Sequence, residues 1–209
     1  MAKEMEGDSA REETAVRRAS RVDVSGIVSS LCAAFDDDPV AMFVFHGQRR
    51  RRRGLAAFFR ALLLGFGYLN AGEVWTLEGL PGAALWAPPG KGRPRPTDFL
   101  KLAPAIPFSL GVSSWSVLEF LVRMDARRPP EDHWYLSTLG VTPQRQHQGI
   151  GSRLMQPVLD KCDGENLPAY LESSKERNVS FYRSHGFEVV DELTARKGPT
   201  VWLMYREPR

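Results

Sequence analysis

One stretch decides the fold, and it reads His133-Trp-Tyr-Leu-Ser-Thr-Leu-Gly-Val-Thr-Pro-Gln-Arg-Gln-His-Gln-Gly-Ile-Gly-Ser-Arg-Leu154. Residues 133–141 are apolar and predict a central strand, and residues 149–160 place apolar side chains on one face of a helix. The polar loop 146–151 therefore lies where that helix begins. Backbone N–H groups at a helix start have no intrahelical acceptor and carry the positive end of the helix dipole, so such a loop binds phosphate readily.

Two glycines suit this loop to that task. Gly149 lets the backbone approach an anion without a side chain in the way, and Gly151 lets the new helix lie close to its strand. An ordinary strand-to-helix turn can carry the same pair of glycines, so the pair alone does not decide between the two interpretations.

A second segment adds to the pattern, and it reads Asn178-Val-Ser-Phe-Tyr-Arg-Ser-His-Gly-Phe187. Asn178 and Tyr182 are four residues apart, so they share one face of a helix. Gly186 is well suited to end that helix, and Phe187 starts the next predicted strand.

Gln146-x-x-Gly149-x-Gly151 after an apolar strand, followed by Asn178-x-x-x-Tyr182-x-x-x-Gly186-Phe187, resembles the GCN5-related N-acetyltransferase (GNAT) family. Segments 134–141 and 169–174 are similar to puromycin N-acetyltransferase and its relatives. The resemblance is specific over residues 133–205 and generic over residues 14–95. It implies an α/β (α+β) fold, with a GNAT-type mixed, mostly antiparallel central sheet that is flanked by helices and has splayed central strands.

The composition bounds the class of protein. The chain has 209 residues, of which 43% are hydrophobic and 25% charged, as in a soluble globular domain. Residues 1–13 lack an apolar period and predict a disordered tail, which leaves 14–209 as a single domain. The two cysteines lie far apart and no apolar signal core is present, so we expect free thiols and a cytoplasmic location. The four histidines and two cysteines show no metal-ligand spacing, so no metal site is expected.

The remaining predicted elements alternate between strands and helices. A capping box of Ser20 and Asp23 starts a first helix, and a second capping box spans Ser173–Glu176. Trp115, Leu118, Phe120 and Leu121 are expected in the core or in a pocket wall. The predicted elements are strands at 14–18, 73–77, 83–87, 168–172, 187–191 and 200–205, a helix at 24–35, a helix beginning with Arg49–Arg53 and apolar over 55–69, a loop at 88–96, and two helices within 99–127.

Two charge runs allow more than one interpretation. Arg49–Arg53 could bind nucleic acid, but no aromatic residues interleave it, so the solvated first turns of a helix are favoured and no nucleic-acid partner is expected. The apolar part of that helix is too short to span a membrane, so no membrane partner is expected. Asp36–Asp38 could bind a cation or a cationic substrate, although a solvated turn at a helix end is the simpler interpretation.

The family resemblance implies acetyl-CoA as co-substrate and assigns roles to residues. It places the pyrophosphate on the loop residues Gln146, His147, Gln148, Gly149, Ile150 and Gly151, with Ser152 as a further donor. It places the pantetheine on the main chain of Leu139, Gly140 and Val141, with Asn178 as a bonding partner. Tyr182 would protonate the leaving thiolate, since a phenol keeps its proton at neutral pH. A core tyrosine with a satisfied hydroxyl is the alternative.

The general base is less well determined. Glu172 ends the strand beside the central one and could accept the amine proton directly or through a water molecule. It could equally anchor a helix cap. His133 and Glu119 are poorer candidates.

These assignments predict an N-acetyltransferase that acts on a primary amine of a small molecule, as a monomer or homodimer. A protein or peptide N-acetyltransferase is an alternative, and so is a non-catalytic acyl-CoA-binding regulatory domain. Asn178 and Tyr182 argue against the regulatory domain, because binding alone needs no acid. A nucleotide-binding module is disfavoured because no G-x-x-x-x-G-K-[ST] motif is present.

Overall fold

Seven strands form one sheet in the order β1–β2–β3–β4–β5–β7–β6. The computed structural model describes residues 15–71, 73–91 and 114–209. Neighbouring strands are antiparallel except for β4 and β5, which are parallel. The predicted mixed, mostly antiparallel sheet is therefore confirmed. The strands are β1 (Val16–Arg18), β2 (Glu73–Leu77), β3 (Gly82–Ala87), β4 (Trp134–Val141), β5 (Ala169–Ser173), β6 (Glu188–Thr194) and β7 (Thr200–Arg206).

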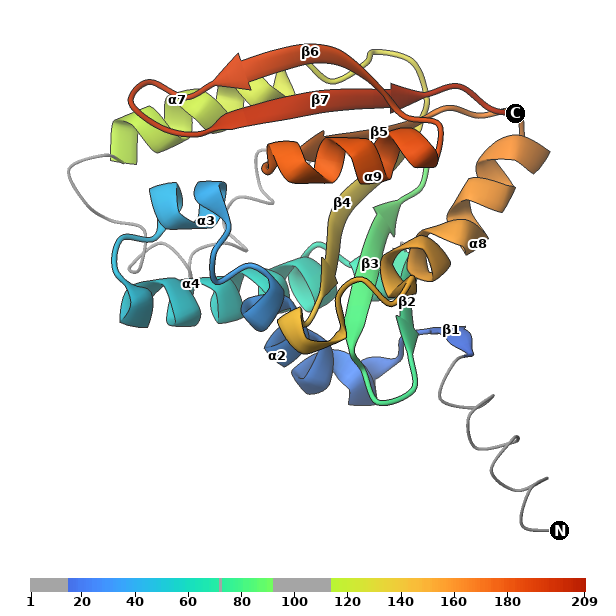
Figure 1. Ribbon diagram of the computed structural model, residues 1–209, viewed down its shortest axis with the longest axis horizontal. Coiled ribbons are helices and arrows are strands. Elements are labelled where there is room, and N and C mark those ends of the chain that lie inside the picture. Colours follow the sequence, from blue (N-terminus) through green and yellow to red (C-terminus); the bar gives the residue numbers. More distant parts are fainter. Residues whose placement is uncertain (1–14, 72, 92–113) are drawn as a thin grey trace, which may run out of the picture.

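Helices cover both faces of this sheet, and β6 and β7 run across the direction of β3 and β4 (Figure 1). The described helices are α2 (Val24–Ala34), α3 (Pro39–Val44), α4 (Gln48–Arg60), α5 (Tyr68–Ala71), α7 (Ser114–Asp125), α8 (Ile150–Gly164) and α9 (Val179–Ser184). A π-helical turn, Ala61–Gly65, follows α4 directly. Short 3-10 turns span Arg21–Asp23, Pro143–Arg145 and Glu176–Asn178.

Strand β3 shows how the core is divided, because its side chains alternate between two buried clusters. Ala84 and Trp86 join the cluster that α8 and α9 cover, whereas Ala83 and Leu85 join the cluster that α2 and α4 cover. All six residues of β3 are buried. A strand covered on both faces reads as a continuous apolar run, which is why Ala83–Ala87 could be predicted from the sequence.

The two central strands, β4 and β5, separate halfway along their length. β4 and β5 pair only at Trp134–Ala169, Tyr135–Tyr170 and Leu136–Leu171, although both strands continue beyond these pairs. On the other side, Leu85 pairs with Thr138 and Trp86 with Leu136, so Ser137 is an extra residue that bulges out of the β3–β4 ladder. A bulge bends its strand and re-aims the groups beyond it. The predicted splay thus begins at the bulge.

Helix starts follow local side-chain chemistry. The predicted capping box of Ser20 and Asp23 is present, with the Asp23 carboxylate accepting from the backbone N–H of Ser20. The Ser20 hydroxyl donates a further hydrogen bond to the same carboxylate. Asp38 caps α3 by accepting from the N–H groups of Val40 and Ala41, and Pro39 occupies the first helical position. The arginine run forms the first two turns of α4, as predicted.

Several predictions need correction. Trp115 and Leu118 were expected in a core or pocket wall, but they are 77% and 49% exposed, and only Phe120 of that group is fully buried. The capping box at Ser173–Glu176 is wrong, because Ser173 is buried and donates to the carbonyl of Lys175. The helix predicted to end at Asp160 runs to Gly164 with Pro157 inside it.

Three further predictions lie outside the described residues. They are the disordered tail at 1–13, the loop 88–96 from residue 92 onward, and the first of the two helices within 99–127.

Candidate functional site

The loop between β4 and α8 lies where the sequence placed it. Gln146, His147, Gln148 and Gly149 are exposed, whereas Ile150 is buried at the first position of α8. Gln146 folds back and donates from Nε2 to the carbonyl of Val141 at 3.1 Å. The loop is therefore braced against the end of β4, and the first N–H groups of α8 point away from the helix without intrahelical acceptors.

Gly149 is the N-cap of α8 and has a left-handed backbone, with φ +72°. An added Cβ would meet no heavy atom within 4 Å, so open space adjoins the start of the helix. Gly151 has a different role from the one predicted. A Cβ there would lie 3.2 Å from the ring of Phe181, so its small size lets α8 approach α9 more than the strand. Ser152, in the first turn of α8, is partly exposed.

Leu139, Gly140 and Val141 occupy the part of β4 that has left β5. Their other edge pairs with Ala84, Ala83 and Gly82 of β3, so the sheet continues on one side only. Gly140 packs against α2, where an added Cβ would lie 2.8 Å from Leu31. This unpaired edge can accept an extended ligand as if it were another strand.

Tyr182 reaches this region from α9. Its side chain is 8% exposed, and its ring packs at right angles to those of Phe181 and Phe187. Burial and the nearby Asp38 carboxylate raise the pKa of the Tyr182 hydroxyl well above its usual range. Asn178 lies one helical turn before it and is partly exposed; its side chain makes no capping bond to α9.

Glu172 lies on β5 on the face opposite α8, and its side chain is 7% exposed. Arg128 donates from Nε to its Oε1 at 3.2 Å and from a terminal nitrogen to the Tyr135 hydroxyl at 2.9 Å. The guanidinium also stacks on the Tyr135 ring at 4.0 Å. A buried carboxylate needs such a partner, so Glu172 anchors Arg128 and not a helix cap.

Two further tyrosines, Tyr170 and Tyr68, lie near Glu172 and Arg128. We call Glu172, Arg128, Tyr135, Tyr170 and Tyr68 the Glu172 cluster. Tyr170 is fully buried, and its hydroxyl lies near Glu172 without a hydrogen bond of normal geometry; burial and this carboxylate raise its pKa. Burial raises the pKa of the Tyr68 hydroxyl, and the charges of Arg128 and Glu172 act on it as well. Tyr68 follows the π-turn after α4.

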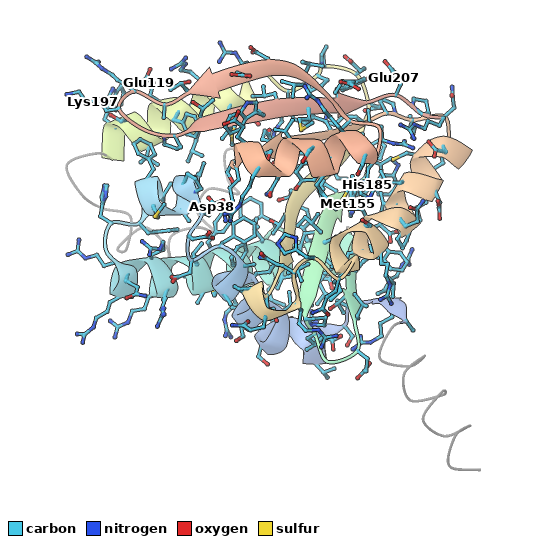
Figure 2. The ribbon with its side chains drawn as sticks, viewed as in Figure 1. Asp38, Glu119, Met155, His185, Lys197 and Glu207 are labelled. Atoms are coloured by element: carbon cyan, nitrogen blue, oxygen red, sulfur yellow. The ribbon has the colours of Figure 1, made fainter. Side chains whose placement is uncertain are left out.

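The other two candidate bases, Glu119 and His133, lie away from the gap between β4 and β5. Glu119 pairs with Arg123 on α7, and Figure 2 places it at the outer end of the molecule, away from β4. His133 precedes β4, at the end where β4 and β5 are paired, and its Nδ1 lies 2.7 Å from the carbonyl of Glu131.

The carboxylates of Asp36–Asp38 form ion pairs and hydrogen bonds with other residues of the protein. Asp36 is near Arg51 and Arg52, and Asp37 pairs with Lys175 and Arg177. Asp38 is 3% exposed and lies in the interior beside α3 (Figure 2), where Ser174 donates a hydrogen bond to it. These contacts join the α2–α3 turn to the segment between β5 and α9. We call them the aspartate clasp, comprising Asp37, Asp38, Ser174, Lys175 and Arg177.

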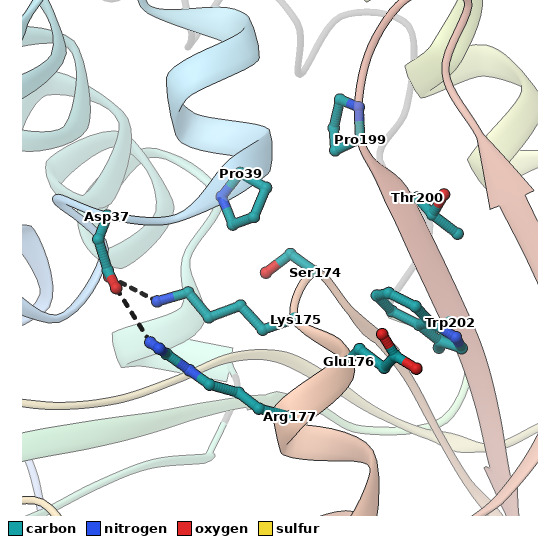
Figure 3. A pocket seen from close by; sticks show the side chains of 9 residues that line it. All are labelled: Asp37, Pro39, Ser174, Lys175, Glu176, Arg177, Pro199, Thr200 and Trp202. Carbon is teal, nitrogen blue, oxygen red and sulfur yellow. Dashed lines mark hydrogen bonds and ion pairs between the residues drawn. The ribbon is translucent and has the colours of Figure 1, made fainter.

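An open groove of about 420 Å³ lies along this clasp (Figure 3). Asp37 with its two cationic partners forms one side, and Trp202 of β7 lies on the other. Its lining residues are Asp37, Pro39, Ser174, Lys175, Glu176, Arg177, Pro199, Thr200 and Trp202.

Sequence reasoning missed Tyr68 and Arg128. Each comes from a segment with no motif, and only the fold brings the two close to Glu172. Within the described ranges, no group of three His, Cys, Asp or Glu side chains could hold a metal ion. Among the helices of those ranges, none is long and apolar enough to cross a membrane.

Comparison with known proteins agrees with this arrangement. Residues 122–207 match the model of the acetyltransferase (GNAT) domain. An uncharacterised N-acetyltransferase of Schizosaccharomyces pombe is 27% identical over 184 residues, which cover 83% of this chain and 74% of that protein.

Two solved structures share the fold over nearly their whole length. One is a histone acetyltransferase HPA2 and related acetyltransferase of Corynebacterium glutamicum, with a TM-score of 0.69, 22% identity, and 93% of this chain and 96% of that one covered. The other is the PaiA N-acetyltransferase of Thermoplasma acidophilum in complex with coenzyme A, with a TM-score of 0.56, 12% identity, and 92% and 98% covered. The sequence patterns, the domain matched over residues 122–207 and the splayed sheet agree in their similarity to acetyltransferases of the GNAT family.

Proposed function

We propose that this enzyme transfers the acetyl group of acetyl-CoA directly to a primary amine of a small molecule, with Tyr182 as general acid. The observation that carries the proposal is the parting of β4 and β5 beside the start of α8, with Tyr182 reaching the same region from α9. Acetyl-CoA suits the gap between β4 and β5 chemically. The start of α8 offers free N–H groups to its pyrophosphate, and the free edge of β4 offers main-chain groups to its pantetheine amides.

The cofactor-binding roles follow from position. The backbone of Gln146–Gly151 would hold the pyrophosphate, with Ser152 as an added donor. The free edge of Leu139, Gly140 and Val141 would pair with the pantetheine amides, and Asn178 would bond the same arm. The PaiA structure, which shares the fold, contains coenzyme A and supports this choice of cofactor.

The transfer step needs a proton acceptor and a proton donor. The amine nitrogen attacks the thioester carbonyl carbon, so a C–N bond forms, the C–S bond breaks, and the nitrogen loses one proton. The leaving thiolate takes the Tyr182 proton. Because burial and Asp38 raise the pKa of this phenol, it stays protonated at neutral pH and can act as a donor.

Glu172 is the proposed acceptor of the amine proton, directly or through a water molecule. The bond to Arg128 occupies Oε1 and fixes the orientation of the carboxylate. An acceptor amine of low pKa would need little help from this base.

A protein or peptide N-terminus is the second candidate acceptor. The open groove along the aspartate clasp favours it, because it is bordered by backbone turns, two prolines and Trp202 and could receive an extended chain. The buried Glu172 cluster favours a compact amine instead. A non-catalytic acyl-CoA-binding domain is a weaker alternative because it would not need Tyr182.

The deciding experiment screens acceptors with purified protein and follows free CoA with a thiol reagent. The panel contains puromycin, polyamines, aminoglycosides and short peptides. Turnover of small amines is the expected result, and reaction with peptides alone would favour the second candidate. Binding of acetyl-CoA with no turnover of any acceptor would favour the regulatory domain.

The state of the two cysteines is relevant to the cellular location of the protein. Both are free, and burial raises the pKa of Cys32 to about 11 and that of Cys162 to about 12. Such thiols are protonated and unreactive at neutral pH, which is compatible with the cytoplasmic location that we propose.

A further inference from the structure

One buried arginine lies at the point where β4 and β5 separate, on the face of the sheet opposite α8. Arg128 follows the last turn of α7, and its side chain is 8% exposed. Its Nε donates to Oε1 of Glu172 at 3.2 Å, and a terminal nitrogen donates to the Tyr135 hydroxyl at 2.9 Å. The guanidinium therefore contacts one residue from each of the two central strands.

These two contacts lie on either side of the end of the β4–β5 pairing. Tyr135 of β4 is still paired with Tyr170, whereas Glu172 is the first residue of β5 after the last pair, which is Leu136–Leu171. Arg128 thus bridges the paired part of β4 and the part of β5 that has left it. A change in this bridge would move the proposed base relative to the strand edge that would hold the pantetheine.

The surroundings hold the guanidinium in one orientation. Its Cζ lies 4.0 Å from the centre of the Tyr135 ring, so the planar group stacks on that ring. Pro129 and Pro130 follow Arg128 directly, and their fixed φ angles restrict the chain that carries it. A guanidinium is a rigid fork with donors in fixed directions, whereas an ammonium is a compact point charge. A lysine would therefore lack the fork that reaches both acceptors with this geometry.

The other titratable groups around Glu172 leave Arg128 as its counter-charge. Burial raises the pKa of three nearby phenols, which stay neutral at neutral pH; they are Tyr68, Tyr135 and Tyr170. Asp125 lies 3.6 Å from Nε of Arg128, but it is 51% exposed, so water screens its charge. Within the described part of the chain, Arg128 is the cation that pairs with the buried Glu172 carboxylate.

We infer that Arg128 is a positioning residue of the transfer reaction, which acts through Glu172 by holding its carboxylate charged and in a fixed orientation beside the gap. This role rests on the proposed function. A displacement of about 1 Å in a reacting group can cost about 100-fold in rate. A buried carboxylate that loses its cationic partner also takes up a proton more readily, and a protonated Glu172 cannot accept the amine proton.

The test compares Arg128→Lys and Arg128→Met with wild type, using acetyl-CoA and the amine of the acceptor screen that turns over fastest. Arg128→Lys keeps the charge but loses the fork, so kcat should fall by about tenfold or more while the pH–rate profile keeps its position. Arg128→Met also removes the charge. Its kcat should fall by about 100-fold or more, and the acid limb of its pH–rate profile should move to higher pH by at least about one pH unit. The KM for acetyl-CoA should change less than about twofold in both variants.

Arg127→Met is the matched control, because Arg127 precedes Arg128 in the same turn and pairs with the Asp191 carboxylate at 3.0 Å. Both side chains of that pair are more than one third exposed, so its loss should leave kcat and the pH–rate profile unchanged.

A double-mutant cycle shows whether Arg128 acts through Glu172. Glu172→Gln keeps Oε1 as an acceptor for Arg128 but cannot take the amine proton. In this background Arg128→Lys should cost less than about twofold in kcat, because the group that Arg128 positions is already inactive.

Three results would overturn the inference. One is a wild-type kcat and an unmoved pH–rate profile in Arg128→Met, or an equal loss in Arg127→Met. Another is a pair of losses that add in the double-mutant cycle, or a fall in acetyl-CoA affinity equal to the fall in kcat, since both indicate a general structural role. If Arg128→Met does not fold, Arg128→Lys decides, and a kcat within about twofold of wild type is the third.

The two proposals fail differently. Wild-type protein that acetylates an amine and loses activity in Glu172→Gln, but not in Arg128→Lys, contradicts the role of Arg128 alone. A Glu172→Gln enzyme that equals wild type removes the proposed base, and the role of Arg128 is overturned with it. Wild-type protein that neither binds acetyl-CoA nor acetylates an amine contradicts the proposed function as a whole.

Discussion

Among single residues, Gly149 combines an unusual backbone conformation with open space at a helix start. Its φ of +72° disfavours any side chain, and an added Cβ would enter the space in front of the N–H groups of α8. Gly149→Val should therefore strain the loop and block the proposed pyrophosphate position. We expect acetyl-CoA affinity, measured by calorimetry, to fall by at least about tenfold.

Gly47→Val is the matched control, because Gly47 is also a helix N-cap with φ +80° and open space around it. It carries similar backbone strain at a different helix. Unchanged acetyl-CoA affinity in Gly149→Val, or an equal loss in Gly47→Val, would contradict the assignment of the loop.

Tyr182 allows a sharper kinetic test. Tyr182→Phe keeps the buried ring but removes the proposed proton donor, so the single-turnover rate should fall by about 10²–10⁴-fold while the KM for acetyl-CoA changes little. Asn178→Ala would remove the proposed bond to the pantetheine in both ground and transition states, so it should raise KM more than it lowers kcat. A single-turnover rate for Tyr182→Phe within about threefold of wild type would make Tyr182 a structural residue.

The positions of the candidate site residues could be predicted from the sequence only where a motif contains them. Gly149 and Tyr182 stand in spaced patterns, and the structure places both beside the splay. Ser137 and Arg128 stand in no pattern, because a β-bulge and a buried ion pair depend on how distant segments meet. Glu172 could be named from its place on a strand, but its pairing with Arg128 depends on a loop 44 residues earlier.

Among the elements, the α2–α3 turn and the segment between β5 and α9 are held together by the aspartate clasp. Asp38 caps α3 through two N–H groups and also accepts from Ser174. Asp38→Ala should leave these buried donors unsatisfied and lower the free energy of unfolding by about 1–2 kcal/mol. Urea denaturation measures this change.

Asp38→Asn retains a side-chain oxygen for the cap and should lose less stability than Asp38→Ala. Equal losses in the two variants would show that the carboxylate charge, and not the cap, holds the turn. This clasp also explains why Asp36–Asp38 was ambiguous in the sequence: the run does end a helix, but the clasp partners of Asp37 and Asp38 lie more than 130 residues away in the chain.

Element boundaries were predictable where one face of an element is uniformly apolar, as in β3 and α2. The prediction failed for α7, whose Trp115 and Leu118 are apolar but exposed. Apolar composition alone cannot reveal which face of a helix meets the sheet. The π-turn after α4 could not be predicted either, since Ala61–Gly65 differ little from ordinary helix-forming residues.

At the scale of the whole molecule, acid should weaken the fold through two carboxylates that are paired with arginines, Asp23 with Arg17 and Asp163 with Arg206. The hydrogen bond from Arg17 lowers the pKa of Asp23, and the bond from Arg206 lowers that of Asp163. A depressed folded-state pKa means that the stabilisation is present above the unfolded-state pKa of about 4 and is lost as the pH falls below it. Urea unfolding between pH 7 and pH 3 should show this loss.

Asp23→Asn provides the comparison for this pH dependence. The variant should be less stable at pH 7, and its stability should change less than that of wild type between pH 5 and pH 3. Parallel curves for the two proteins would mean that Asp23 does not contribute to the acid sensitivity.

The family resemblance implied a mixed, mostly antiparallel sheet, but neither the resemblance as stated nor any pattern in the residues predicted the order of the strands. Strand positions could be read from apolar runs, but the pairing of β5 with β7, and of β7 with β6 at the edge, depends on contacts between distant segments. The assignment of residues 14–209 to one domain stays a prediction, and so does the choice between monomer and homodimer.

The seven strands are joined at their middle by only three residue pairs between β4 and β5. Mechanically, the molecule is a four-stranded and a three-stranded plate that share a short seam. A ligand bound between β4 and β5 would add contacts between these two plates, so it would stabilise the fold as well as react. Saturation at 100 times the dissociation constant would add about 2.7 kcal/mol to the free energy of unfolding. Melting temperature would then report occupancy even for an analogue that cannot react.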